Sequence, residues 1–235
     1  MRWISRAAAL SIVCLGMFPG GRESAAQVPG GFERKVIVLD AAHGGTDTGA
    51  QISDHVAEKD VTLALAVRLR SLLAARGFSV VLTRDNDAAL STDQRAEAAN
   101  RAHAVACLVI HATASGVGVH LATSGLNAIE TTAPGAAVPW DDAQAAYLPQ
   151  SQRLAAGIGD AVTRSQVPLV LGRAAMRPLD NLTCPAVSVE IAPLGGGDSD
   201  KTPVTDAGYQ QRVSIAVAGA LVLWRNQAGS SGVTP

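Results

Sequence analysis

The sequence has little of three things that often reveal a protein's function. Of its 235 residues only 3 are cysteines, and none stands in a closely spaced pair, which argues against a structural zinc site built on such pairs. Lysine and arginine total 19 against 20 acidic residues, without a basic stripe, so neither a nucleic acid nor an anionic membrane is expected as a partner. No uninterrupted apolar run reaches the ~20 residues of a membrane-spanning helix. We therefore expect no stable membrane association.

The amino-terminal segment has the pattern of a secretory signal. Arg2 and Arg6 flank the start of an apolar run over residues 7–18, and small residues follow it. We expect cleavage after Ala26 and export to the periplasm or the extracellular space. Cys14 lies inside the run but lacks the small residue that a lipoprotein signal places just before its cysteine, so a lipid anchor is not favoured.

The remaining length suits one domain, since domains typically span about 50 to 250 residues. We expect a short leader over residues 27–34, a single domain over residues 35–225, and a flexible Gly/Ser-containing tail over residues 226–235. Cys107 and Cys184 lie in apolar runs and are interpreted as buried thiols. Export to an oxidising compartment would also permit a disulfide between them.

Strand and helix patterns alternate along this domain. Short apolar runs predict strands at residues 35–40, 78–83, 105–111, 118–123, 169–173 and 186–191. Helical spacing and a capping box at residues 91–94 predict helices at 61–76, 92–102, 150–165 and 205–225. The segment 125–149 has no periodicity and is expected to be a long loop. The alternation predicts an α/β fold, a three-layer sandwich around a mostly parallel, mixed sheet.

Three ionisable residues follow or end predicted strands. His43 comes just after the first strand, His111 ends the third, and Glu190 lies near the end of the last. Because ligands of open α/β folds bind in the crevice outside the carboxyl ends of the strands, these residues are expected to meet there. Taken one at a time, each histidine also fits a hydrogen-bonded structural role.

The two histidines suggest a metal centre. His43 precedes two glycines, which allow a sharp turn, and His111 ends an apolar run where its ring needs a specific partner. Catalytic zinc commonly takes two histidines and one glutamate and keeps a fourth position open. The carboxylate candidates near the first strand are Asp47, Asp54, Glu58 and Asp60, and spacing alone does not choose among them. Glu58 also fits a simple role at a helix amino terminus.

Glu190 lies within an apolar strand, where a carboxylate is costly unless it is paired or functional. A buried acid with a raised pKa, next to a metal site, can act as general base and then as general acid. The structural alternative is an ion pair with Arg84 or Arg95. His55, His103 and His120 receive no role, and the alternation around His120 does not settle whether it faces the crevice or the core.

The segment from Val38 to Ala50, which contains Asp40-Ala41-Ala42-His43-Gly44-Gly45, resembles the opening motif of the zinc-dependent N-acetylmuramoyl-L-alanine amidases of the Amidase_3 type. The resemblance continues in order through further segments: 58–64, 82–87, 95–100, 110–112 and 185–190. It therefore covers most of residues 35–225.

The resemblance implies a function and assigns roles. His43, Glu58 and His111 would hold one Zn²⁺ per chain, and Glu190 would be the catalytic carboxylate. The implied reaction is hydrolysis of the amide between N-acetylmuramic acid and L-alanine of peptidoglycan. The choice of Glu58 rests on the resemblance. Two alternatives are a zinc peptidase or carboxypeptidase acting on stem peptides and a non-catalytic wall-binding or regulatory relative.

The chain departs from the family pattern around these motifs. Ala41-Ala42 stands where Pro-Gly is common, Thr113 where asparagine is common, and residues 191–197 replace the usual run after the catalytic glutamate. These changes affect the rim of the crevice and therefore the substrate range more than the metal ligands.

Some amidases of this family carry an inserted segment that covers the zinc until an activator protein removes it. The segment 125–149 falls at that place, with Glu130, Asp141 and Asp142 as candidate ligands. The sequence does not favour this interpretation, because such a segment should contain a helix and an acidic ligand. An activator protein as partner therefore has no support in the sequence.

Overall fold

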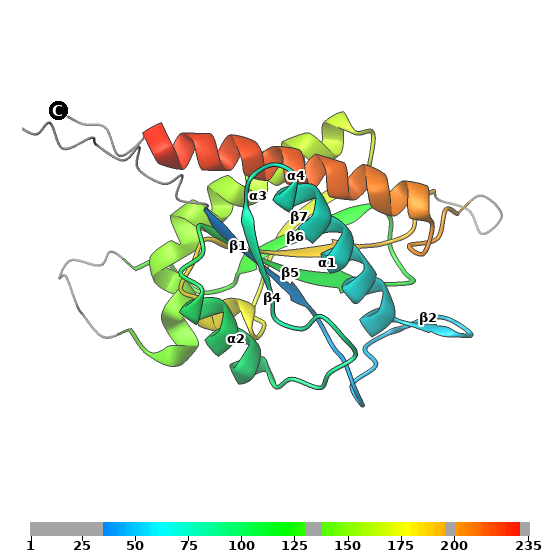
Figure 1. Ribbon diagram of the computed structural model, residues 1–235, viewed down its shortest axis with the longest axis horizontal. Helices are drawn as coiled ribbons and strands as arrows, with labels where there is room; N and C mark the ends of the chain where they lie inside the picture. Colours follow the sequence, from blue (N-terminus) through cyan, green and yellow to red (C-terminus); the bar gives the residue numbers. More distant parts are fainter. Residues whose placement is uncertain (1–34, 130–137, 196–200, 231–235) are drawn as a thin grey trace, which may run out of the picture. The chain divides into compact units, whose positions relative to one another are not determined.

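A six-stranded mixed sheet forms the centre of the fold (Figure 1). Its strands, in spatial order, are β4 (Ser79–Leu82), β1 (Val36–Ala41), β5 (Ala106–Ala112), β8 (Ala186–Ile191), β6 (Val119–Ser124) and β7 (Leu169–Ala174). The first four run parallel, β6 is antiparallel to β8, and β7 runs parallel to β6. The predicted mostly parallel, mixed sheet is confirmed.

The structure is a computed structural model that describes residues 35–129, 138–195 and 201–230, with side chains in the last range up to residue 227. The expected signal, residues 1–26, and the leader, residues 27–34, lie outside the described residues. Among the helices of the described ranges, none has the length and apolar character needed to cross a bilayer.

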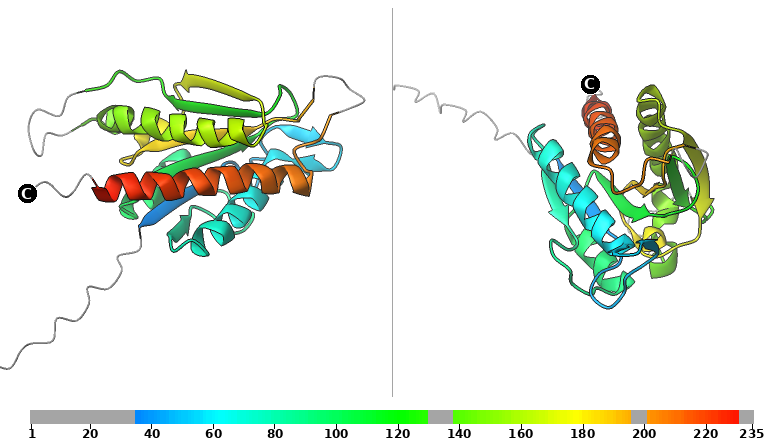
Figure 2. Two further views of the ribbon diagram at one scale, coloured as in Figure 1. Left: turned by 90° about the horizontal axis from the view of Figure 1, so that it is seen from above. Right: turned by 90° about the vertical axis from the view of Figure 1, so that its right-hand side faces the viewer.

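Helices cover both faces of the sheet. Helices α1 (Glu58–Ala74), α3 (Leu148–Arg164) and α4 (Ala207–Ser230) pack on one face, and Figure 2 shows α3 and α4 side by side. Helix α2 (Thr92–Arg101) and the short 3-10 helix η2 (Leu179–Asn181) lie on the other. This arrangement confirms the expected three-layer sandwich.

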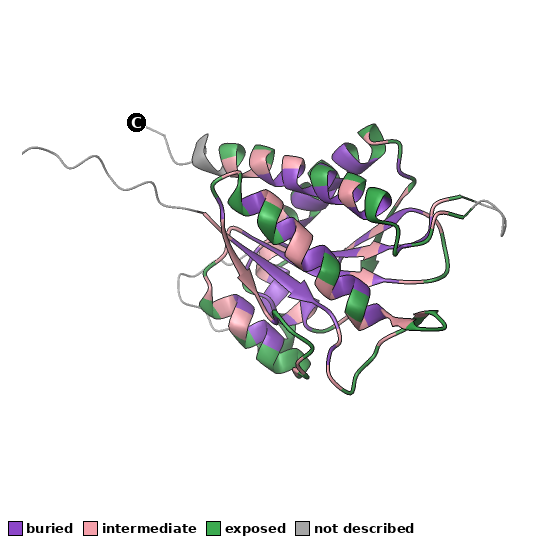
Figure 3. Ribbon diagram, turned by 45° about the vertical axis from the view of Figure 1, so that its right-hand side comes forward, coloured by how far each residue is buried: buried purple, intermediate pink, exposed green. Residues whose placement is uncertain are grey.

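Alternation along the strands divides the core between these faces. In β5, Leu108 and Ile110 belong to the larger cluster under α1, α3 and α4, whereas Cys107 and Val109 belong to the smaller cluster under α2. Because successive side chains of a strand point to opposite faces, His111 lies on the α2 face. Figure 3 shows the buried central strands and the helices with one buried and one exposed side.

The local sequence explains the start of α2 and the buried face of α1. In α2 the hydroxyl of Ser91 accepts a hydrogen bond from the amide of Gln94, and the side chain of Gln94 accepts one from the amide of Ser91. This reciprocal pair is the predicted capping box. Helix α1 buries Leu65, Leu69 and Leu73 against the sheet, as its spacing predicts.

Two expectations about irregular segments are wrong in part. The expected loop at 125–149 contains a 3-10 helix, η1 (Trp140–Tyr147), and α3 already begins at Leu148. Pro149 occupies the first turn of α3, where a missing amide hydrogen costs nothing, so it does not mark the end of a loop. The expected tail also starts too early, because α4 continues to Ser230.

The two cysteines of the domain form a disulfide, so the interpretation as buried thiols is wrong. The sulfur atoms of Cys107, in β5, and Cys184, just before β8, are bonded, and the two Cα atoms lie 6.2 Å apart. The neighbouring positions of β5 and β8 in the sheet bring them together, which sequence alone does not show. The disulfide lies in the smaller cluster on the α2 face.

A short hairpin precedes α1 and was not predicted. Strands β2 (Gln51–Ser53) and β3 (Val56–Ala57) are antiparallel, and β3 leads directly into α1. Helix α1 therefore begins at Glu58, directly after the hairpin.

Candidate metal centre

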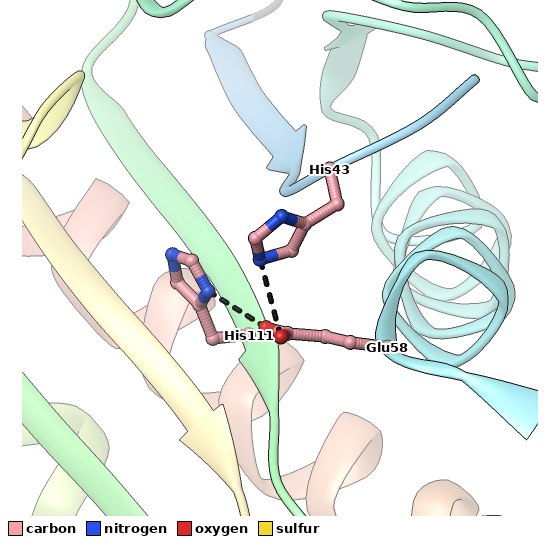
Figure 4. Close-up of side chains that lie close together, drawn as sticks. All are labelled: His43, Glu58 and His111. Carbon is pink, nitrogen blue, oxygen red and sulfur yellow. Dashed lines mark hydrogen bonds and ion pairs between the residues drawn. The ribbon is translucent and has the colours of Figure 1, made fainter. Parts of the chain in front are cut away.

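The predicted site residues meet at one edge of the sheet. His111 is in register with Glu190 on the neighbouring strand β8, and His43 follows the end of β1 on the other side of β5. Glu58 reaches the same edge from the start of α1. Three of these side chains, those of His43, Glu58 and His111, point toward one another in Figure 4.

His43 occupies a tight turn of unusual backbone geometry. Its own φ is 63°, and the φ angles of Gly44 and Gly45 are 136° and 60°. Positive φ is unfavourable for a residue with a side chain and is found mainly where the surroundings enforce it. The guanidinium of Arg95 donates a hydrogen bond of 2.6 Å to the carbonyl of His43 and so helps to hold this turn.

The His43 ring is held between two carboxylates. Its Nδ1 lies 2.9 Å from Oδ2 of Asp47, and its Nε2 lies 3.1 Å from Oε2 of Glu58. The hydrogen bond with Glu58, and then that with Asp47, raises the pKa of His43 against the opposing effect of burial. Asp47 thus fixes the ring orientation and leaves Nε2 directed into the site.

Glu58 is buried and accepts four hydrogen bonds. Its Oε1 lies 2.8 Å from Nδ1 of His111 and accepts from the amide of Ala112, while its Oε2 faces His43 and accepts from the amide of Ala50. Burial alone would raise the pKa of Glu58, but the hydrogen bonds from the two histidines and two amides outweigh it and hold the pKa well below its usual range. Glu58 therefore stays an anion between two imidazoles.

Gly49 leaves the space that this arrangement needs. A Cβ atom at this position would lie 2.6 Å from Cδ2 of His43 and 2.7 Å from Oε2 of Glu58, and φ is 65°. Both distances are shorter than any normal contact to a Cβ atom. A residue with a side chain would displace the His43 ring or the Glu58 carboxylate.

The donor set fits a divalent metal ion of the zinc type. One ligand atom from each of His43, Glu58 and His111 lies within 4.8 Å of the others, the only such group in the described part of the chain. Nε2 of His111 is buried and finds no hydrogen-bond partner among the described residues. Two imidazoles and one carboxylate at an accessible edge match the ligand set of catalytic zinc.

The other candidate carboxylates have different positions. Asp47 contacts the outer nitrogen of His43, Asp54 lies in the exposed turn of the β2–β3 hairpin, and Asp60 accepts a hydrogen bond from the amide of Ala57. The structure therefore distinguishes Glu58 from its acidic neighbours, which the spacing of the sequence did not. Asp47 is a contributor that the sequence interpretation listed only as an alternative ligand.

Glu190 is less buried than expected. Its side chain is 37% exposed, because it points to the α2 face at the open end of β8 and not into the core. The expected alternative of an ion pair with Arg84 or Arg95 is wrong. Its carboxylate instead pairs with His120 of β6, whose Nδ1 lies 2.8 Å from Oε2 of Glu190.

Arg84 and Arg95 are buried beside the turn that carries His43. Arg95 pairs with Asp40 at 2.9 Å and donates to the carbonyl of Ala41, and Arg84 donates to the carbonyls of Ala41 and Ala42. These bonds satisfy the backbone where β1 ends and turns into His43. The two arginines therefore support the turn and do not contact Glu190.

His120 is the site residue that the sequence interpretation missed. It faces Glu190 across the antiparallel pair β6–β8 and therefore lies at the same sheet edge as the candidate metal ligands. His120 lies near the start of its strand, so in an all-parallel sheet it would lie at the edge opposite to Glu190. His120 lies next to Glu190 only because β6 runs antiparallel to β8, and no sequence pattern predicted that direction.

The described parts of the segment 125–149, residues 125–129 and 138–149, give no support for a covering role. Because β6 is antiparallel to β8, it ends at Ser124 on the sheet edge opposite Glu190, and the segment begins there. Asp141 pairs with Arg177, and neither Asp141 nor Asp142 belongs to the metal-type group. Glu130 lies outside the described residues.

The chain is similar in sequence to proteins that are named N-acetylmuramoyl-L-alanine amidases. A germination-specific N-acetylmuramoyl-L-alanine amidase of Bacillus subtilis is 28% identical over 217 residues, which cover 83% of this chain and 81% of that protein. N-acetylmuramoyl-L-alanine amidase AmiA of Escherichia coli is 40% identical over 79 residues, 34% of this chain and 27% of AmiA.

Solved structures show the same fold. The catalytic domain of the amidase CwlV from Paenibacillus polymyxa superimposes with a TM-score of 0.63 at 23% identity, covering 82% of this chain and 98% of that domain. The amidase Ami1 of Mycobacterium smegmatis gives a TM-score of 0.64 at 20% identity, with 82% and 97% covered. The family described as N-acetylmuramoyl-L-alanine amidase matches residues 37–222, and the chain belongs to that family.

Proposed function

We propose that this protein is a zinc-dependent amidase that hydrolyses the bond between N-acetylmuramic acid and the first L-alanine of the peptidoglycan stem peptide. The observation that carries the proposal is the convergence of His43, Glu58 and His111 beside Glu190 in a chain of the amidase family. The Bacillus subtilis relative, aligned over 81% of its length, is named for this activity.

His43, Glu58 and His111 would hold the zinc ion. A zinc ion bound there would supply a Lewis acid that polarises the scissile carbonyl and makes a water molecule more acidic. The protein contributes the orientation of the ligands, since Asp47 fixes the His43 ring and two backbone amides fix the Glu58 carboxylate. Such supporting bonds determine how well a metal site is preorganised.

Glu190 would move the proton that the reaction requires. Its carboxylate accepts a proton from the attacking water as the oxygen forms a bond to the carbonyl carbon. It then donates that proton to the alanine nitrogen as the carbon–nitrogen bond breaks. The products are the free lactyl carboxylate and a peptide with a free amino terminus. The exposed position of Glu190 at the end of β8 suits this exchange with substrate.

Export is part of the proposal, because peptidoglycan lies outside the cytoplasmic membrane. The support is the secretory pattern of residues 1–26, together with a disulfide of a kind that persists in oxidising compartments. Detection of the mature chain in the periplasmic or culture fraction of the host, and not in the cytosol, would test this step.

The decisive experiment is digestion of purified peptidoglycan with zinc-loaded and chelator-treated enzyme, followed by identification of the products. We expect new L-alanine amino termini and intact muramoyl glycan, in the zinc-loaded sample only. Release of D-alanine would instead identify a carboxypeptidase. The variant Glu190→Gln should keep about one zinc per chain and lose hydrolysis, and unchanged hydrolysis would show that the role of Glu190 is wrong.

A further inference from the structure

His120 lies directly opposite Glu190 in the antiparallel pair β6–β8 and hydrogen-bonds its carboxylate through Nδ1 at 2.8 Å. We propose that His120 is a positioning residue for Glu190, which holds Oε2 so that the other oxygen, Oε1, is presented for proton transfer. This inference rests on the proposed function, since it assigns a partner to the carboxylate that the reaction uses.

Strand register places the pair next to the metal ligands. Glu190 is in register with His111 on β5 and with His120 on β6, so the three residues stand side by side on three adjacent strands. Residues directly opposite one another in neighbouring strands point to the same face of a sheet. His120 thus flanks Glu190 on the side away from His111.

The exposure of the pair argues against a purely structural role. The side chains of His120 and Glu190 are 27% and 37% exposed, so neither residue is needed to satisfy the other in a dry core. An exposed glutamate has three rotatable bonds and would otherwise sample several orientations. A hydrogen bond at one oxygen removes most of that freedom.

The loop before β6 holds the His120 ring in place. A Cβ atom at Gly116 would lie 2.8 Å from Cε1 and 3.2 Å from Nε2 of His120, so the ring packs directly on the glycine backbone. Gly116 has a φ of 81°, a conformation that favours glycine. The carboxylate is therefore supported by a ring that is itself fixed.

The backbone on either side of the pair is also tied down. The amide of Ala192 donates to the carbonyl of Gly118 at 2.7 Å, and the hydroxyl of Tyr209 lies 3.0 Å and 2.8 Å from the carbonyls of Gly118 and Ala192. The hydroxyl of Tyr209 reaches these carbonyls from the opposite face of the sheet, where Tyr209 belongs to the larger core cluster. These contacts keep β6 and β8 in register without touching either side chain of the pair.

Three substitutions separate positioning from a general structural role. His120→Leu removes the hydrogen bond, His120→Asn keeps an amide nitrogen near the place of Nδ1, and His120→Gln places one near Nε2. With a soluble muramoyl peptide as substrate and zinc-loaded enzyme, we expect His120→Leu to lower kcat about 10- to 100-fold, the range typical of supporting residues, with KM changed less than about threefold. We expect His120→Asn to restore most of the kcat and His120→Gln to restore less.

Tyr209→Phe provides the structural control, because it weakens the same strand pair and leaves the hydrogen bond of His120 intact. It should lower thermal stability and leave kcat near the wild-type value at a temperature where the variant is folded. Equal kcat for His120→Leu and wild type, or equal losses in His120→Leu and His120→Asn, would overturn the positioning role. If His120→Leu does not fold, the other two variants decide. A higher kcat for His120→Asn than for His120→Gln supports the positioning role, and equal kcat values overturn it.

The outcome also separates this inference from the proposed function. If wild-type enzyme releases no L-alanine amino termini, the proposed function is wrong and the positioning role falls with it. If the wild type is active and Glu190→Gln is inactive while His120→Leu is fully active, only the positioning role is wrong. Zinc content is measured on every variant as a control, and we expect it to stay at about one per chain.

Discussion

The carboxylate of Asp47 accepts a hydrogen bond from Nδ1 of His43 at 2.9 Å, which leaves Nε2 of the same ring 3.1 Å from Glu58. A carboxylate on the outer nitrogen fixes the tautomer of a metal-binding histidine and strengthens it as a ligand. Asp47 is two-thirds exposed, so it is not retained to fill the core. We therefore expect its contact with His43 to affect the zinc affinity of the site.

Substitution of Asp47 should therefore weaken metal binding. We expect Asp47→Asn to lower zinc affinity about 10- to 100-fold, the range typical for the loss of such supporting carboxylates, with little change in thermal stability of the metal-free protein. Competition with a zinc-binding dye measures the change. Asp54→Asn, in the exposed turn of the β2–β3 hairpin, is the matched control and should leave affinity unchanged. Equal affinities for the two variants would contradict this role.

A side chain at Gly49 should disrupt the centre directly. Gly49→Ala places a Cβ atom within 2.7 Å of both the His43 ring and the Glu58 carboxylate at a backbone φ of 65°. We expect loss of stoichiometric zinc and of hydrolysis, measured by elemental analysis and product release. The control is Gly157→Ala, in α3, where a Cβ atom meets nothing within 4 Å. That variant should be as active as wild type and about 0.5–1 kcal/mol more stable, because alanine is the better helix former. Full zinc content in Gly49→Ala would contradict the steric argument.

Removal of Arg95 should destabilise the protein as a whole. The Arg95 guanidinium is buried, pairs with Asp40 and donates to the carbonyls of Ala41 and His43. Loss of one partner of a buried ion pair leaves an uncompensated charge, so Arg95→Ala should lower the free energy of unfolding by about 3–5 kcal/mol in denaturant titration. Arg101→Ala, which removes an exposed pair with Glu97, should cost less than about 1 kcal/mol. Similar losses for both variants would show that the buried network does not support the turn.

The disulfide should contribute measurably to stability. Cys107 and Cys184 close a loop of 77 residues, for which the loss of chain entropy in the unfolded state corresponds to about 4.5 kcal/mol. We expect reduction, or the double substitution Cys107→Ala and Cys184→Ala, to lower the free energy of unfolding by up to this amount. Denaturant titrations with and without reductant measure it. In the double variant the reductant should have no effect, and a wild type that is equally insensitive would contradict the prediction.

The stability of chelator-treated protein should depend on pH in a defined way. Because the pKa of Glu58 is lowered from 4.5, its contribution is present above about pH 4.5 and is lost as the pH falls. Because the pKa of His43 is raised from 6.5, its contribution is present below about pH 6.5 and is lost as the pH rises through the raised value. Both contributions are complete between these values.

The variant Glu58→Gln removes one of these two titrating groups and also the carboxylate that raises the pKa of the other, His43. Thermal unfolding of the two metal-free proteins from pH 3 to pH 9 should therefore give a flatter profile for the variant than for the wild type. The difference between the two profiles should be largest between about pH 4.5 and pH 6.5. Profiles of the same shape would show that the hydrogen bonds between Glu58 and the histidines do not govern the titration.

Local patterns were enough to predict most of the secondary structure. The apolar runs that form β1, β5 and β8 are short and rich in β-branched residues, and the capping box of α2 is a local hydrogen-bond signal. Such signals act between near neighbours in the chain, and for that reason they are visible in the sequence. The same runs placed His43, His111 and Glu190 at strand ends.

Tertiary structure decided the points that depend on which strands are neighbours and in which direction they run. The pairing of β5 with β8 joins Cys107 to Cys184, and the reversal of β6 brings His120 to Glu190. A turn and the start of a helix bring Glu58 between His43, which precedes it in the chain, and His111, which lies 53 residues after it.

The sequence by itself therefore determined the layers of the fold and the strand ends that carry His43, His111 and Glu190. Only the tertiary structure selected Glu58 on the grounds of geometry and showed that Glu190 is exposed and bonded to His120. The physical reason is that side-chain periodicity encodes burial within each element, whereas long-range hydrogen bonds form only after the strands have paired.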